Sequence, residues 1–238
     1  MPKFKLGSDP ELFLIDPNGA FKSSIGLIGG SKMNPRPLNE LGDGYAVQED
    51  NVAVEFNTAP ASSAKEFSDN VGKTVSFLEQ KISSAYGFKF SKASAAFFPQ
   101  VELEDPRAQE FGCDPDFNAW TGKENPKPKA ADETLRSCGG HVHIGYNFAN
   151  ELHQQRAVKL VELFAGVPSV VLDDGLLRKS LYGKHGAYRP KPYGVEYRVL
   201  SNFWVFDPVL REWIWRAVDR ALSSIESNFD IDSLHDPI

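Results

Sequence analysis

Apolar residues recur along the chain at two spacings, which predict both strands and helices. Strands are predicted where apolar residues alternate with polar ones or form short runs, at residues 4–16, 52–57, 88–98, 139–146 and 193–200. Helices are predicted where the spacing is helical, at residues 63–85, 150–166, 168–178 and 208–227. Segments rich in glycine, proline or charge are predicted to be loops, at residues 26–44, 99–137 and 179–193. Strands separated by long helices and irregular segments indicate an α+β fold.

Three pairs of polar residues interrupt the predicted strands, and one residue separates the members of each pair. The pairs are Asp9 and Glu11, His141 and His143, and Glu196 and Arg198. Because strand side chains alternate between two faces, the members of a pair are expected on the same face. Unpaired charge is costly when it is buried. A divalent metal with bound phosphate is the binding partner that we favour.

Further carboxylates, Glu49, Asp50 and Glu55, cluster around the strand at residues 52–57. Carboxylates from neighbouring strands can supply the hard oxygen ligands that Mg²⁺ prefers, and phosphate often completes the shell. Any single carboxylate is more commonly explained by a position on a solvent-exposed strand face than by metal binding. The combination with histidines and arginines favours a metal site.

A basic, glycine- and tyrosine-rich segment lies in the C-terminal half of the chain. Its cations are Arg178, Lys179, Lys184, Arg189, Lys191 and Arg198. Such groups bind phosphates and carboxylates, and arginine can bind them in a fork. A solvated basic loop is the alternative, but the interleaved glycines and tyrosines favour an ordered one. The sequence contains no P-loop, no nucleophile elbow and no zinc-binding cysteine pair.

Composition and charge narrow the classes of function. The 238 residues, 41% of them hydrophobic, suit one catalytic domain over residues 1–238 with a flexible tail from about residue 229. A net charge of −6 argues against general nucleic-acid binding but is compatible with a local basic pocket. Cys113 and Cys138 could pair, but a reduced protein fits better. With no signal peptide and no apolar run of about 20 residues, a cytoplasmic protein without membrane contact is predicted.

Four segments resemble, in the same order, the metal-binding strands of glutamine synthetases and glutamate–cysteine ligases. They are residues 9–16, 50–57, 140–145 and 196–198. The sequence is most similar to the phage-type carboxylate–amine ligases of this superfamily, through Phe-Gly-Cys-Asp-Pro-Asp-x-Asn-Ala-Trp at 111–120 and the Tyr-Gly…Tyr-Gly-Val-Glu-Tyr-Arg run at 182–198. The similarity extends from about residue 6 to about residue 206.

The resemblance implies the fold of the glutamine synthetase and guanido kinase catalytic domains. In that fold a curved, mainly antiparallel sheet has helices packed on one face. It also implies an ADP-forming enzyme that uses ATP with Mg²⁺ or Mn²⁺. In such enzymes a carboxylate is phosphorylated to an acyl phosphate, which an amine attacks to give an amide. The expected partners are small-molecule or peptide substrates, an oligomer is possible, and a phage-encoded protein would act in the host cytoplasm.

Matching positions imply roles for particular residues. The metal ligands would be Asp9, Glu11, Asp50, Glu55, His141 and Glu196. The ATP-binding residues would be His143, Arg198, Arg189, Arg178 and Lys191. Arg198, Arg189 and Glu55 would be catalytic, and Asp114, Asp116 and Asn118 are expected to face the acid or amine substrate. The chain departs from the larger enzymes at Asp9, where they have Glu, and in being much shorter. Glu49 and Asp50 are alternatives for the remaining acidic ligand position of the family, with Asp50 preferred by pattern.

Three other functions remain open at this point. The same metals could serve a hydrolase, the same scaffold could serve a guanidino-type phosphotransferase, and a degenerate site could be a non-catalytic nucleotide-binding module. The basic segment argues against a simple hydrolase, which would need fewer phosphate-binding groups. The presence of acids, histidines and arginines at every matched position argues against a degenerate site.

Overall fold

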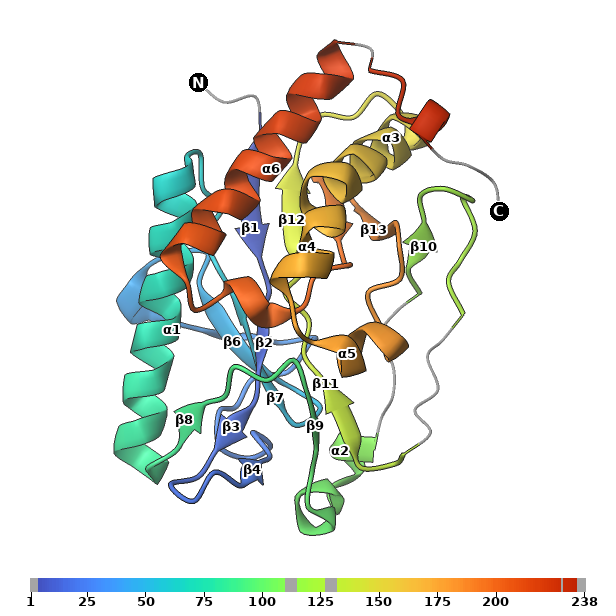
Figure 1. Cartoon of the computed structure of the whole chain (residues 1–238). Coiled ribbons are helices and arrows are strands. Elements are labelled where there is room, and N and C mark those ends of the chain that lie inside the picture. The colour runs from blue at the N-terminus through green and yellow to red at the C-terminus, as the bar shows by residue number, and fades with distance from the viewer. Residues whose placement is uncertain (1–3, 110–114, 127–131, 228, 235–238) are drawn as a thin grey trace.

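The computed structural model describes residues 4–109, 115–126, 132–227 and 229–234 (Figure 1). All strand pairs within its sheets are antiparallel. Helices together with antiparallel sheets confirm the predicted α+β class and the mainly antiparallel pairing. Within the described ranges, no helix has the length and apolar character needed to cross a membrane.

A five-stranded sheet joins segments from both ends of the chain. Its strands, in spatial order, are β1 (Lys5–Ser8), β12 (Val142–Gly145), β14 (Gly194–Tyr197), β13 (Ala187–Lys191) and β10 (Phe117–Asn118). Leu6, Ile144 and Val195 face one another in register and are fully buried in the main core. Because side chains alternate along a strand, the next residues, including His143 and Glu196, point to the opposite face.

A four-stranded sheet continues from the first one. Its order is β2 (Glu11–Leu12), β7 (Ala53–Asn57), β6 (Ala46–Asp50) and β5 (Arg36–Pro37). Between β1 and β2 the chain passes from one sheet to the other, and the Ser8 carbonyl accepts a hydrogen bond from the Thr58 amide at 3.1 Å. The smaller sheets are β4 (Phe21–Lys22), β3 (Leu14–Ile15) and β8 (Lys89–Phe90), and β11 (Leu135–Ser137) with β9 (Ala95–Phe97).

Helices α1 (Ala64–Tyr86), α3 (Glu151–Val161) and α6 (Pro208–Glu226) are amphipathic and pack on the buried face of the first sheet (Figure 1). The other helical segments are α2 (Pro106–Gln109), a π-helical turn (Glu162–Gly166), α4 (Val167–Leu172) and α5 (Leu176–Leu181). Single 3₁₀ turns lie at Asn39–Leu41, Gln100–Leu103, Asn202–Trp204 and Asp232–Leu234. Ser63 caps α1 through the Glu66 amide, and Asp207 caps α6 through the Val209 amide, as their sequences indicate. These caps fix the starts of the two longest helices.

Several boundaries differ from those that the sequence predicts. The strand predicted at residues 4–16 is three short strands, because the segment runs through different sheets. The predicted loops contain β5, β10, β11 and β13, and β6 was not predicted. These strands are only two to five residues long, so local pattern carries little signal for them. The helices predicted at residues 150–166 and 168–178 are instead α3, the π-helical turn and α4 in succession, followed by α5.

Residues 229–234, which fall in the predicted tail, lie against α3. Ile231 is buried, and Lys159 pairs with Asp232 at 2.5 Å.

Candidate active site

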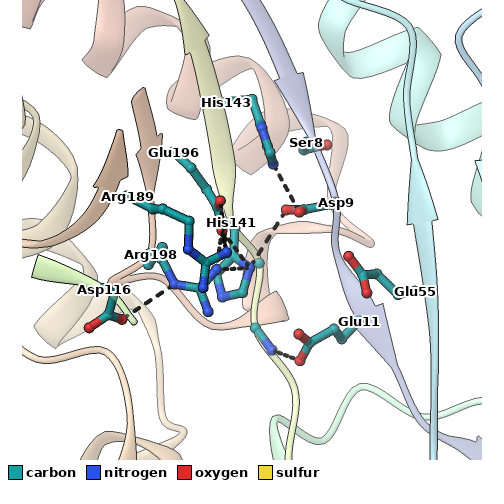
Figure 2. Close-up of polar contacts among 12 residues, drawn as sticks. Ser8, Asp9, Glu11, Glu55, Asp116, His141, His143, Arg189, Glu196 and Arg198 are labelled. Atoms are coloured by element: carbon teal, nitrogen blue, oxygen red, sulfur yellow. Dashed lines mark hydrogen bonds and ion pairs between the residues drawn. The ribbon is translucent and has the colours of Figure 1, made fainter. Parts of the chain in front are cut away.

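A row of polar side chains crosses the five-stranded sheet on the face away from the helices. The strand register aligns His143 with Glu196, and Glu196 with Arg189. Residues that face each other across antiparallel strands have neighbouring side chains. The polar row therefore joins β12 to the β13–β14 hairpin, which lies later in the sequence (Figure 2).

Glu196 is the centre of this row, and its side chain is fully buried. Its carboxylate accepts a hydrogen bond from Arg198, lies 3.2 Å from Arg189 Nη1, and lies 2.8 Å from Lys191 Nζ. Burial and the nearby charge of Asp9 would raise the pKa of Glu196. Arg198 and the two histidines outweigh them and bring that pKa to about 2. Glu196 is therefore ionised and is held by three cations.

Asp9 lies between the two histidines (Figure 2). Its Oδ2 is 2.9 Å from His143 Nε2, and its Oδ1 is 3.6 Å from His141 Nδ1. Burial alone would raise the pKa of Asp9, but the two histidines bring it below its ordinary range. Burial, and then Arg198, lower the pKa of His141 to about 4, which leaves a neutral imidazole at pH 7. We call these residues the cation-paired group: Asp9, His141, His143, Arg189, Lys191, Glu196 and Arg198.

A second group of carboxylates lies where the two sheets meet. Glu11 faces Glu55 in the register of β2 and β7, and Glu55 faces Gln48 on β6. Gln48 Nε2 donates a hydrogen bond to Glu55 at 2.6 Å, and the Gly139 amide donates one to Glu11 at 2.6 Å. Asp50 is two residues from Gln48 and therefore lies on the same face of β6. We call Glu11, Asp50 and Glu55 the acid group.

The pKa values of the acid group are all raised. Burial, and then Asp50, raise the pKa of Glu11 to about 7. Burial, and then the charges of Asp9, Asp50 and Glu11, raise the pKa of Glu55 well above its ordinary value. Burial also raises the pKa of Asp50. Within the described part of the chain, neither Glu11 nor Glu55 forms an ion pair, so burial favours the protonated form of both side chains.

The comparison with known protein families bears directly on this site. Residues 133–223 match the family model described as phage phiEco32-like COOH.NH2 ligase-type 2. The match confirms the resemblance to phage-type carboxylate–amine ligases, and the family's name indicates carboxylate–amine ligation. No curated protein and no solved structure shows significant similarity to the chain.

The segment that matches the ligase family supplies half of the site, and the N-terminal strands supply the other half. His141, His143, Arg189, Glu196 and Arg198 lie within residues 133–223. Asp9 and the three residues of the acid group lie before that segment and are brought to it by the pairing of β1 with β12 and by the junction of the two sheets. The fold thus assembles one site from the matched ligase segment and the N-terminal acids.

The side chains are suited to divalent metal. Ligand atoms of Asp9, His141 and Glu196 lie within 4.8 Å of one another. Asp9 Oδ1 is buried and makes no hydrogen bond to any described residue. Carboxylate oxygens and a neutral imidazole are established ligands of divalent cations. An unsatisfied buried carboxylate oxygen and an uncompensated acid group both indicate that a cation fits here.

The structure separates the two alternatives for one ligand position. Glu49 Oε1 accepts hydrogen bonds from the Gly26 and Gly29 amides at 2.9 and 2.8 Å, and its Oε2 pairs with Arg107 at 3.0 Å. Alternation along β6 places Glu49 and Asp50 on opposite faces. Glu49 therefore fixes the loop at residues 26–29, while Asp50 lies with the acid group.

The predicted cations fall into two classes. Arg189, Lys191 and Arg198 lie in the row around Glu196, and Arg198 Nε also lies 3.3 Å from Asp116 Oδ2. Arg178 is fully buried on α5 and donates to the Val199 carbonyl at 3.1 Å, and its charge acts on Glu11. Arg178 thus acts on Glu11 through its charge and does not belong to the row around Glu196.

Of the three residues predicted to face a substrate, the structure describes Asp116 and Asn118. Asp116 contacts Arg198 and accepts a hydrogen bond from Asn125 at 2.9 Å, so it borders the site. Asn118 donates to the His185 carbonyl at 3.0 Å and accepts from the Trp120 amide, so it shapes the adjoining loop. Asp114 and Cys113 lie outside the described residues.

Three polar residues in contact with these strands were not selected from the sequence. Gln48 binds Glu55, and its spacing of two residues from Asp50 was the available signal. Tyr193 hydrogen-bonds His143 Nδ1 from the turn before β14. Glu162 is buried in the π-helical turn and bonds Tyr197 and His185 on the opposite face of the sheet. Nothing in the local sequence distinguishes Glu162 from an ordinary helical glutamate.

Proposed function

We propose that this protein is an ATP-dependent carboxylate–amine ligase that uses Mg²⁺ or Mn²⁺ and passes through an acyl phosphate. The observation that carries the proposal is the contact between two kinds of charge in one buried site. A surplus of carboxylates adjoins a cluster of arginine and lysine, and part of that cluster lies in a segment that matches a ligase family. Metal-bound polyphosphate is a ligand that would satisfy both.

The proposed metal ligands are those that the resemblance implies. They are Asp9, Glu11, Asp50, Glu55, His141 and Glu196. A divalent cation bound there would supply positive charge to phosphate oxygens as negative charge develops on them. The raised pKa values of Glu11 and Glu55 support this assignment, because ligation requires the ionised form and a cation would favour it.

We propose that the cations of the row hold the transferring phosphoryl group. Arg189 and Arg198 are preorganised by Glu196 and stabilise charge on the phosphate oxygens, with Lys191 beside them. His143 and Arg178 are further proposed contacts of the nucleotide. The γ-phosphoryl group passes from ATP to the substrate carboxylate, which leaves ADP. The amine then attacks the acyl carbon, phosphate departs, and the amine loses one proton.

No covalent protein nucleophile is needed for this sequence of steps. Cys138 lies beside the histidine strand, but its side chain is fully buried. Burial raises the pKa of its thiol well above the ordinary value, which disfavours the reactive thiolate. Carboxylate activation by ATP accounts for the reaction without it.

The finer fold assignment belongs with this proposal. We propose that the two joined sheets correspond to the curved sheet of the glutamine synthetase and guanido kinase catalytic domains, in one domain over residues 1–238. The substrates would be a small-molecule or peptide carboxylate and an amine.

The proposal is tested by incubating the protein with ATP, Mg²⁺ and pooled carboxylates, amines and short peptides. A condensed product, lighter by one water than two inputs and formed with ADP and phosphate, is expected. Phosphate release without such a product would indicate a hydrolase, and a phosphorylated guanidine would indicate a phosphotransferase. Glu55→Gln is the matched variant, because it keeps the size of the side chain and is expected to abolish turnover.

A further inference from the structure

Tyr193 reaches the site from a tight turn. It lies in the two-residue turn between β13 and β14, and its hydroxyl is hydrogen-bonded to His143 Nδ1. The Tyr146 amide donates to the Tyr193 carbonyl at 3.1 Å. Gly194 has φ +150°, and a Cβ there would collide with the Ile144 carbonyl. The turn is therefore held tightly against β12, which carries His143.

The His143 ring lies between a phenol and a carboxylate. Its Nε2 lies 2.9 Å from Asp9 Oδ2 in an ion-pair contact, and its Nδ1 is hydrogen-bonded to the Tyr193 hydroxyl. Burial would lower the pKa of His143, but Asp9 outweighs burial and raises that pKa above its ordinary value. The ring is therefore held at both nitrogens, by the phenol on one side and by the carboxylate on the other.

The two oxygens of Asp9 are consequently different. Oδ2 faces His143, whereas Oδ1 is buried, makes no hydrogen bond to a described residue, and lies 3.6 Å from His141 Nδ1. Residues that contact a metal-binding side chain fix the orientation of that side chain and tune its affinity for the metal.

We propose that Tyr193 is a positioning residue that acts through His143 to hold Asp9 with Oδ1 turned toward a divalent cation. This inference rests on the proposed function, because it assumes a cation in this site. It gives His143 a role on Asp9 in addition to its proposed contact with the nucleotide. Tyr193 itself need not touch any substrate.

The test combines metal binding with nuclear magnetic resonance. Tyr193→Phe removes one hydroxyl and keeps the ring, and Tyr86→Phe is the control. Tyr86 is also partly exposed, and its hydroxyl donates one hydrogen bond to the Leu27 carbonyl at 3.1 Å, away from the site. In metal-free protein, the ¹⁵N signal of His143 Nδ1, which loses its hydrogen-bond partner, should shift in Tyr193→Phe alone. Affinity for Mn²⁺, measured by calorimetry, should fall about tenfold.

A double-mutant cycle distinguishes action through His143 from a general loss of structure. If Tyr193 acts through His143, then Tyr193→Phe should cost no further Mn²⁺ affinity in a His143→Gln background. Unchanged Mn²⁺ affinity in Tyr193→Phe, or a fall without any shift of the His143 signals, would overturn the inference and leave the proposed function standing. Absence of Mn²⁺ binding by the wild-type protein would instead overturn both.

Discussion

The cation-paired group and the acid group adjoin each other, but they differ in whether neighbouring cations balance their carboxylates. In the first, Glu196 contacts three cations, and its pKa is lowered to about 2. In the second, Glu11 and Glu55 receive hydrogen bonds but form no ion pair with a described residue, and their pKa values are raised. The chain thus pairs one set of carboxylates with cations and leaves Glu11 and Glu55 without an ion pair among the described residues.

The contrast separates carboxylates whose charge the protein's own cations balance from carboxylates that have no such cation. Breaking a buried ion pair by removing one partner is strongly destabilising. Neutralising a buried carboxylate that has no cation should instead stabilise the protein while abolishing metal binding. Substitutions in the two groups should therefore change stability in opposite directions, and that difference can be measured.

The largest effect is expected for Glu196→Gln. This change leaves Arg189, Lys191 and Arg198 around a neutral side chain, so the free energy of unfolding should fall by about 3–5 kcal/mol. Urea denaturation measures the fall. Glu212→Gln is the control, because Glu212 pairs with Arg216 on the surface of α6 and its loss should cost less than about 1 kcal/mol. Similar losses in the two variants would show that Glu196 is not the centre of the group.

In metal-free protein, Glu11→Gln is expected to increase the free energy of unfolding, whereas Glu196→Gln decreases it. The pKa of Glu11 is raised from 4.5 to about 7, so folding of the wild type becomes less favourable as pH rises through that interval. The variant should be the more stable protein by on the order of 3 kcal/mol near pH 8, and the difference should vanish below about pH 4.5. Urea denaturation across this range, with a chelator present, measures it. A variant less stable than the wild type near pH 8 would contradict the assignment.

A smaller effect, on the stabilisation by Mg²⁺, is expected to distinguish two adjacent residues of β6. A divalent cation at 100 times its Kd should stabilise the wild type by about 2.7 kcal/mol. Asp50→Asn should weaken that response to Mg²⁺. Glu49→Gln should keep it, while costing on the order of 1–2 kcal/mol through its bonds to backbone amides and Arg107. Thermal unfolding with and without Mg²⁺ distinguishes the two, and the reverse pattern would make Glu49 the ligand.

The smallest effect is expected for His185→Gln, on the opposite face of the sheet. His185 Nδ1 lies 2.9 Å from Glu162, which raises the pKa of a half-exposed histidine. The stability from this pair is present below about pH 6.5 and is lost as pH rises through the higher folded-state pKa. The variant should lose less than about 1 kcal/mol at pH 6 and keep its Mg²⁺ response. A lost Mg²⁺ response would extend the site to this face.

Local pattern predicted α1 and α6 well, because the helical spacing of apolar residues is encoded within a few residues, and Ser63 and Asp207 cap these helices in the structure. It also paired His141 with His143, and both contact Asp9. It grouped Asp9 with Glu11, which the structure instead divides between the cation-paired group and the acid group. It could not predict β13, whose charged Arg189 and Lys191 are typical of a loop until β14 and β10 pair with the strand. Nor could it separate the two charge groups, since that division depends on strand register across the chain.

The central claim is that the acid group holds buried protons that a divalent cation displaces. Calorimetric titration with Mn²⁺ near pH 6.5, in two buffers of different ionisation enthalpy, counts those protons directly. We predict saturable binding that releases about one proton or more at this pH, and less release in Glu11→Gln. Saturable binding without proton release, or no binding, would contradict the account.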